Sequence, residues 1–295
     1  MFDGLLQEKA VLVADGAMGT TLFELGLESG DSPERLNVEQ PDMIAQVHRN
    51  FVKAGADLIL TNTFGGNRRR MSLHRMEDRV GEFNRAGVSI AKRVAEEAER
   101  PVVVAASVGP TGDLFAPLGL LSHAEGVEVF SEQMESLVAA GADILWIETL
   151  SAWEEIAAAT EAASGLATPH AVTLSFDTNG RTMMGLRPSD FGKWWTELPP
   201  DRRPVALGAN CGTGLQEALT AAAAIKEAAA EATVIVKSNC GIPVFREGGL
   251  NYPEGPEQMG DYARQALEAG CSIIGACCGS TPPHIQAIRA ALDGA

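Results

Sequence analysis

Eight apolar segments of β-type sequence recur along this chain of 295 residues, and a segment with helical character follows each of them. The segments are nearly continuous in apolar residues, as expected for parallel strands that are buried on both faces. Eight β-α units in series predict a (β/α)8 barrel of the TIM type, with a doubly wound open sheet as the alternative. No low-complexity linker divides the chain, so we expect one domain over residues 1–295. The eight segments are residues 11–15, 57–63, 102–109, 144–149, 171–177, 205–211, 233–239 and 272–278.

The ends of the predicted helices carry sequence patterns that support the same repeat. Ala-Gly-Ala-Asp or a similar sequence precedes three segments, at residues 54–57, 140–143 and 269–271, where glycine suits the end of a helix. Ser122 and Ser151 each stand three residues before a glutamate, which predicts a capping box at two helix starts. Thr281 followed by Pro282 predicts a third start.

Polar side chains gather at the carboxyl ends of most of these segments. A barrel brings the carboxyl ends of its strands together around one mouth, where enzymes of this fold place their active sites. We therefore expect a functional polar ring at the mouth. Its members are Asp15, Asn62, Thr63, Ser107, Glu148, Asn210, Cys211, Asn239, Cys240, Cys277 and Cys278.

Three cysteines of this ring have the chemistry of a soft-metal site. Cys211 ends one segment, and the adjacent Cys277 and Cys278 end another. Three thiolates leave the fourth position of a tetrahedral zinc ion open, as in catalytic zinc sites. Neighbouring cysteines share a metal only where the chain turns, which Gly275 and Gly279 permit. Without further context, three unmetallated core thiols are the alternative.

The other two cysteines are expected to have different roles. Cys271 lies six residues before Cys277, about 20 Å away along a strand, and is expected to be a small buried hydrophobic residue. Cys240 is a candidate fourth ligand that would close the site as a structural zinc centre. Because Asn239 and Cys240 are neighbours on a strand, only one of them is expected to face the mouth.

The composition restricts the partners and the compartment. A net charge of −16 and an isoelectric point near 4.7 disfavour nucleic acid and anionic membranes. No apolar run reaches the roughly 18 residues of a membrane span, and the first residues do not resemble a signal peptide. Five cysteines, an odd number that includes a vicinal pair, favour a reduced, cytoplasmic protein.

Several short motifs follow one another in order between residues 10 and 292. They are DGAMGT at 15–20, TNTF at 61–64, GPT at 109–111, IET at 147–149, NCG at 210–212 and 239–241, and GACCGSTP at 275–282. In these motifs the chain resembles the zinc-dependent homocysteine S-methyltransferase family. That family includes betaine–homocysteine methyltransferase and the homocysteine module of cobalamin-dependent methionine synthase.

The resemblance implies a homocysteine-binding (β/α)8 barrel with one zinc ion on Cys211, Cys277 and Cys278. A free thiol with a pKa near 8.5 is only about a few per cent ionised at neutral pH, and zinc would deprotonate it. The substrate sulfur would then take a methyl group by in-line displacement, giving methionine. By the same resemblance, Glu148 would bind the substrate ammonium group, and the backbone near Asp15, Gly16 and Ala17 would bind its carboxylate or backbone atoms.

Four more residues are expected around the substrate. Asn62, Thr63 and Ser107 are candidate hydrogen-bonding residues of the mouth. Asn239 either fills the open position of the metal before the substrate arrives or is an ordinary polar strand end.

The run Arg68-Arg69-Arg70 either binds a negatively charged partner or cofactor or forms a solvated helix face.

The methyl donor is inferred from what the chain lacks. The positions where animal betaine enzymes carry aromatic residues, which would bind a trimethylammonium group, fall on Ser32, Gly65 and Thr149. The 295 residues also contain no segment that resembles a cobalamin or folate domain. We therefore expect a stand-alone module that receives its methyl group from a methylcorrinoid on a separate protein. Betaine and S-methylmethionine are the alternative donors, and a non-catalytic zinc- or thiol-binding protein is the alternative of another class.

Overall fold

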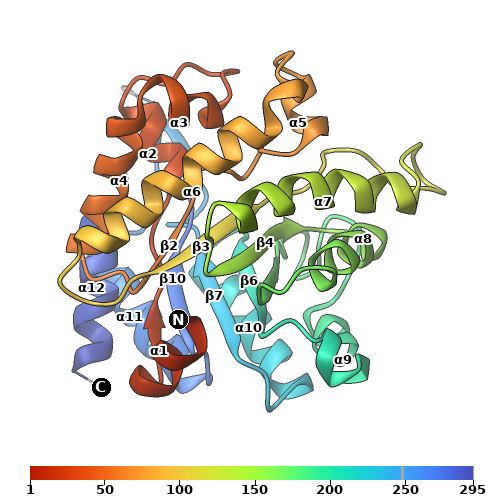
Figure 1. Cartoon of the computed structure of the whole chain (residues 1–295). Coiled ribbons are helices and arrows are strands. Elements are labelled where there is room, and N and C mark those ends of the chain that lie inside the picture. The colour runs from red at the N-terminus through yellow and green to blue at the C-terminus, as the bar shows by residue number, and fades with distance from the viewer. Residues whose placement is uncertain (247–248, 295) are drawn as a thin grey trace.

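The computed structural model describes residues 1–246 and 249–294, and in it eight parallel strands form a barrel surrounded by helices (Figure 1). Their order around the sheet is β1-β10-β7-β6-β5-β4-β3-β2. Each strand overlaps one of the eight predicted segments, so the predicted barrel is confirmed. The strands are β1 (Leu12–Val13), β2 (Leu58–Leu60), β3 (Val103–Val108), β4 (Ile144–Leu150), β5 (His170–Leu174), β6 (Ala206–Cys211), β7 (Val234–Ser238) and β10 (Ile273–Ala276).

The helices cover the outside of the barrel, and most alternate with its strands along the chain. They bury one face; in α4, for example, Ile44, Val47, His48 and Phe51 are buried at helical spacing. The helices are α1 (Phe2–Lys9), α2 (Met18–Glu24), α3 (Leu36–Glu39), α4 (Pro41–Lys53), α5 (Arg68–Ser72), α6 (Val80–Glu97), α7 (His123–Ala139), α8 (Trp153–Ser164), α9 (Pro188–Glu197), α10 (Leu215–Ala228), α11 (Pro256–Glu268) and α12 (Pro282–Asp293).

Two of the three predicted helix starts are confirmed. Ser122 accepts a hydrogen bond from the backbone of Glu125 and caps α7, and Thr281 is the residue that precedes Pro282 at the start of α12. The prediction for Ser151 is wrong, because α8 begins at Trp153 after Ala152 and has no side-chain cap.

The apolar core has two layers. One cluster fills the inside of the barrel and includes the fully buried Trp146, and helix α1 adds Phe2 and Leu5 to its amino-terminal end. A larger cluster lies between the strands and the outer helices. This arrangement leaves the carboxyl ends of the strands free to form a site.

Two features were not predicted from the sequence. An antiparallel hairpin, β8 (Val244–Arg246) with β9 (Gly249–Asn251), is inserted between β7 and α11. Just after it, the ring of Tyr252 lies so close to Gly279 that a Cβ atom there would be 2.1 Å from the ring, and Gly279 has a φ of +83°. Only glycine fits this turn, which directly follows Cys278.

Within the described residues, no helix is long and apolar enough to cross a membrane.

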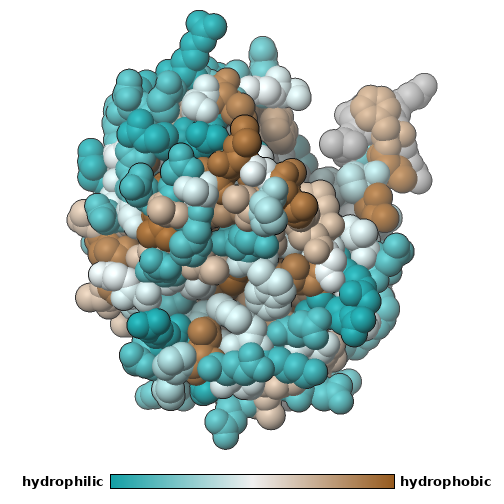
Figure 2. Space-filling view, turned by 90° about the vertical axis from the view of Figure 1, so that its right-hand side faces the viewer, coloured by the Kyte–Doolittle hydropathy of each residue, from teal (hydrophilic) through white to brown (hydrophobic). Residues whose placement is uncertain are grey.

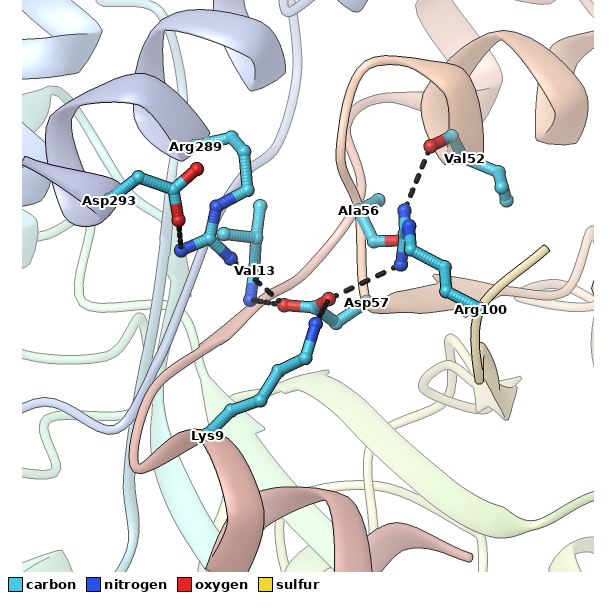
Figure 3. Close-up of polar contacts among 8 residues, drawn as sticks. All are labelled: Lys9, Val13, Val52, Ala56, Asp57, Arg100, Arg289 and Asp293. Carbon is cyan, nitrogen blue, oxygen red and sulfur yellow. Dashed lines mark hydrogen bonds and ion pairs between the residues drawn. The ribbon is translucent and has the colours of Figure 1, made fainter. Parts of the chain in front are cut away.

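The barrel closes between β1 and β2 through two backbone hydrogen bonds, from the Asp57 N–H to the Val13 carbonyl at 2.7 Å and from the Asp15 N–H to the Leu58 carbonyl at 3.0 Å, together with side-chain contacts. A single bridge joins Ala14 to Leu58 there. The buried carboxylate of Asp57 accepts the Val13 N–H at 3.0 Å. The same carboxylate pairs with the three cations that Figure 3 shows around it, Lys9 at 2.6 Å, Arg100 at 3.2 Å and Arg289 at 3.1 Å. Asp57 thus ties α1, the start of β3 and α12 to this seam.

Candidate functional site

A cavity of about 440 Å³ opens at the carboxyl ends of the barrel strands. Figure 2 shows the face of the molecule that lies on the right in Figure 1, where helix α7 begins. On this face, hydrophobic patches lie among hydrophilic side chains. Most of the predicted site residues line the cavity: Asp15, Gly16, Ala17, Asn62, Ser107, Glu148, Cys211, Cys277 and Cys278. Thr63 and Asn239 are not among its lining residues.

The structure brings the three predicted metal-binding cysteines together. Their sulfur atoms all lie within 4.8 Å of one another, and the Sγ atoms of Cys211 and Cys277 are 2.8 Å apart. Sulfur atoms at about 2.3 Å from a tetrahedral zinc ion are about 3.8 Å apart, so the trio needs only small adjustments to hold one. All three side chains are half-buried at the cavity. The donor set therefore fits a soft metal ion with one open position.

The local backbone conformation brings the side chains of these cysteines together. Strand β10 ends at Ala276, two residues earlier than the predicted segment, so Cys277 and Cys278 lie in the turn that follows it. Cys211 ends β6 with a φ of +56°, a conformation that non-glycine residues rarely adopt. Such strained conformations are concentrated at functional sites.

Asn239 braces the cysteines. Its Oδ1 accepts the Cys278 N–H at 3.0 Å, and its Nδ2 donates to the Gly212 carbonyl at 2.8 Å. The side chain therefore links the two segments that carry the cysteines. This use of both amide atoms favours a positioning role over that of a fourth ligand.

Cys240 and Cys271 lie outside the sulfur trio in the described part of the chain. Cys240 is fully buried in the outer core cluster, and its backbone N–H donates to the Cys278 carbonyl at 3.0 Å. Burial raises the pKa of both thiols to about 12, so they are protonated at neutral pH. Both cysteines act here as small core residues.

Sequence reasoning missed Lys237, which is buried on β7 and lines the cavity. Its ammonium group lies 2.8 Å from Asp15 Oδ1. Burial by itself lowers the pKa of Lys237, but the Asp15 and Glu148 carboxylates outweigh it and the pKa is raised. The other oxygen of Asp15 accepts the Leu60 N–H at 2.8 Å. Burying a lysine without a partner is energetically unfavourable. A lysine within an apolar strand was therefore the sequence signal that could have revealed this site residue.

Glu148 keeps part of its carboxylate free. Ser107 Oγ donates to its Oε1 at 2.5 Å, and no hydrogen bond to the other oxygen is found within the described residues. Burial raises its pKa to about 7, opposed by Lys237 and reinforced by Cys277. A cation placed beside the free oxygen would stabilise the ionised form.

Asn62 and Thr63 have structural partners. Asn62 Nδ2 donates to the Pro33 carbonyl at 2.8 Å and to Asn37 Oδ1 at 3.0 Å. Thr63 Oγ1 is buried against Thr61 Oγ1 and donates to the Ser107 carbonyl. Both residues hold the loop after β2, and of the two only Asn62 reaches the cavity.

Asn210, a predicted member of the polar ring, joins β4 to β6 across the intervening β5 through a contact that was not predicted. Asn210 Oδ1 accepts the Thr149 N–H at 3.0 Å, and its Nδ2 donates to Thr149 Oγ1 at 2.7 Å. Thr149 has a φ of +63°, which is rare for a β-branched residue. This clamp fixes the neighbouring residues Glu148 and Cys211 relative to each other.

Replacing Asn210 by alanine is expected to lower kcat/KM for the substrate that the family resemblance implies roughly 10-fold or more, as for other residues that orient metal ligands. The reason is that Thr149 loses both bonds that hold its strained backbone. Initial rates and zinc content measured together check this. Asn50→Ala, on the exposed face of α4, is the control. A variant with wild-type kinetics would show that the clamp is dispensable.

Comparison with known protein families gives one clear match. A family model described as homocysteine S-methyltransferase matches residues 12–292. Methionine synthase of Mycobacterium tuberculosis is 32% identical over 298 residues, which cover 96% of this chain and 24% of that protein. Methionine synthase of Mycobacterium leprae is 31% identical with the same coverage. The chain thus spans about a quarter of the length of these curated relatives.

Solved structures of similar length also match. The homocysteine methyltransferase MmuM from Escherichia coli, in its oxidised form, superposes with a TM-score of 0.78 at 28% identity, covering 98% of both chains. Its metallated form superposes with a TM-score of 0.77 at 27% identity, covering 97% of this chain and 98% of that one.

Proposed function

This chain belongs to the homocysteine S-methyltransferase family, and we propose that it methylates homocysteine sulfur with one zinc ion bound by Cys211, Cys277 and Cys278. The observation that carries the proposal is the sulfur trio in one cavity with the free carboxylate oxygen of Glu148. When bound, zinc supplies a deprotonated substrate thiol at neutral pH. We also propose that residues 1–295 form one homocysteine-binding barrel domain.

The other charged groups of the cavity support an amino-acid substrate. Lys237 is already paired with Asp15, so Glu148 is the carboxylate left to accept the substrate ammonium group. The Ala17 N–H is taken by Ser280 Oγ at 2.9 Å. The Gly16 N–H has no partner in the described part of the chain and is assigned to the substrate carboxylate. A Cβ atom on Gly16 would lie 2.6 Å from Ser280 Oγ, so this tight packing requires glycine there.

Two classes of methyl donor compete for the second half of the reaction. A methylcorrinoid on a separate protein is the donor predicted from the sequence, and similarity to methionine synthases supports it. Betaine and S-methylmethionine are small onium donors, and a cavity of about 440 Å³ is large enough to enclose small substrates. Among the described lining residues, Phe64 alone has a phenyl, phenol or indole ring. The cavity therefore lacks, among these residues, the aromatic cage that would favour betaine as the donor.

The proposal is tested on zinc-loaded protein supplied with homocysteine and, in turn, betaine, S-methylmethionine and methylcobalamin. Methionine formation that requires zinc is the expected result. Calorimetry checks homocysteine binding on the same sample. Binding of zinc and homocysteine without turnover from any donor would favour the non-catalytic alternative, and loss of homocysteine binding would refute the proposed site.

Replacing Glu148 by glutamine is expected to raise KM for homocysteine roughly 10- to 100-fold, the scale of one hydrogen bond to a charged group. Zinc content should not change, because Glu148 is not among the metal ligands. Glu154→Gln, an exposed residue of α8, is the matched control. An unchanged KM in steady-state assays would remove Glu148 from the ammonium site.

A further inference from the structure

The three arginines at the start of α5 have different partners in the structure. Arg68 pairs with Glu132 at 2.6 Å, and Arg69 pairs with Asp113. Both side chains are exposed, which agrees with the solvated-face interpretation. Arg70 is half-buried, and within the described residues its guanidinium group has neither an ion pair nor a hydrogen bond. One member of the basic cluster is therefore left without an internal anion.

Arg70 is also the member of the cluster that lines the cavity holding the cysteine trio. Its side chain packs along the backbone of Gly112, where an added Cβ atom would lie 3.3 Å from Arg70 Cδ and Nη1. His74, just after the end of α5, lines the same cavity. Packing thus presents the guanidinium group to the cavity.

Two more carboxylates that line this cavity, those of Asp31 and Glu34, are already engaged. Asp31 pairs with Arg35 at 2.5 Å. Glu34 accepts the Gly65 N–H at 2.6 Å and the Ser32 hydroxyl at 2.7 Å. Neither neutralises Arg70. A partly desolvated guanidinium group with no partner favours binding of a carboxylate, with which it forms strong bidentate hydrogen bonds.

We propose that Arg70 binds the anionic group of the methyl donor, and that this donor is a small onium compound carrying a carboxylate. The inference rests on the proposed function, which assigns the two charged ends of homocysteine to Glu148 and Gly16. A contact between Arg70 and the donor carboxylate would recognise the donor without an aromatic cage. The inference therefore favours small onium carboxylates over the methylcorrinoid as the methyl donor.

The transfer is balanced without any further reagent. The thiolate sulfur of homocysteine gives an electron pair to the methyl carbon and forms the new C–S bond. The pair of the breaking bond returns to the nitrogen or sulfur of the onium group. The donor leaves as a neutral amine or thioether that still carries its carboxylate, and its bond to Arg70 can persist through the step.

The experiment compares donors that differ only near the carboxylate. Betaine and choline share a trimethylammonium group, but choline has a hydroxymethyl group in place of the carboxylate. With zinc-loaded enzyme and saturating homocysteine, we expect turnover with betaine or S-methylmethionine and little with choline. Arg70→Gln should raise KM for the carboxylate donor roughly 10- to 100-fold. KM for homocysteine and zinc content should stay at wild-type values.

Two further variants control the test. Arg69→Gln removes a neighbouring, ion-paired arginine of the same helix and should leave donor kinetics unchanged. Arg70→Lys keeps the charge but loses the bidentate geometry, so it should recover part of the affinity. Thermal unfolding of each variant shows that the fold is intact, and calorimetric binding of the donor gives a readout independent of turnover.

Three outcomes would overturn the inference. An increase in KM for homocysteine alone would assign Arg70 to the acceptor and leave the proposed function standing. Equal rates with methylcobalamin in wild type and Arg70→Gln, with no binding of any onium carboxylate, would give the donor role to the corrinoid. Failure of zinc-loaded protein to bind homocysteine would refute the proposed function itself, and the inference with it.

Discussion

Replacing Cys277 by serine is expected to abolish stoichiometric zinc binding and to lower methionine formation by more than about 100-fold. Residues that merely orient metal ligands already contribute about 10- to 100-fold to metal affinity or activity, and a ligand contributes more. Cys277 Sγ lies 2.8 Å from Cys211 Sγ, so the change also removes a member of the closest sulfur pair. Zinc analysis and a methionine assay on the same preparation measure both effects.

Cys271→Ala is the matched control for this experiment. It removes a thiol that is more deeply buried than Cys277 and lies outside the sulfur trio, before β10 rather than after it. It should keep one zinc ion per chain and near-normal activity, with a small loss of stability from the lost packing. Zinc retained at full occupancy by Cys277→Ser would contradict the assignment of the trio as the metal site.

The barrel and the cysteine trio could be predicted from the sequence because their determinants are local. Eight apolar runs specify buried parallel strands, and residues at strand ends must meet at one mouth. The predicted end of the last segment was wrong by two residues, since the chain leaves β10 at Ala276 and turns through Gly279. Ser151 failed as a helix cap because β4 continues, after an irregularity between Ile147 and Leu150, as far as Leu150, and α8 starts only at Trp153.

The missed residue Lys237 and the unforeseen roles of Asn210 and Arg70 depend on contacts between distant segments. Lys237 is explained only by Asp15, 222 residues away, and Asn210 only by the backbone of Thr149, 61 residues away. Arg70 differs from Arg68 and Arg69 only in what surrounds it, since all three have the same sequence context. Such pairings follow from the closed barrel, and no periodicity or spacing in the chain specifies them.

Replacing Asp57 by asparagine is expected to lower the free energy of unfolding by about 3–5 kcal/mol, the usual cost of removing one partner of a buried ion pair. Asp57 is 1% exposed and compensates three cations, Lys9, Arg100 and Arg289. Asparagine would still accept the Val13 N–H, but it would turn an amide NH2 toward those cations. The loss falls on the β1–β2 seam, where the described residues form one β-bridge, less backbone pairing than between the other strands of the barrel.

Asp143 provides a matched control, because it occupies the corresponding position before β4. It accepts the Val104 N–H at 2.9 Å, as Asp57 accepts the Val13 N–H. Among the described residues it pairs with one cation, Lys92, and its side chain is 13% exposed. Asp143→Asn should therefore cost only about 1 kcal/mol, since exposed or singly paired ions contribute little.

Denaturant unfolding of both variants, followed by circular dichroism, measures the two losses. Zinc content serves as a check that the mouth is unchanged, because Asp57 lies at the amino-terminal end of β2, away from the cysteines. The difference of about 2–4 kcal/mol between the two variants isolates the three-cation cluster from the hydrogen bond that both aspartates share. Equal losses would assign the role of Asp57 to the hydrogen bond alone, and the seam would then be closed by backbone and packing.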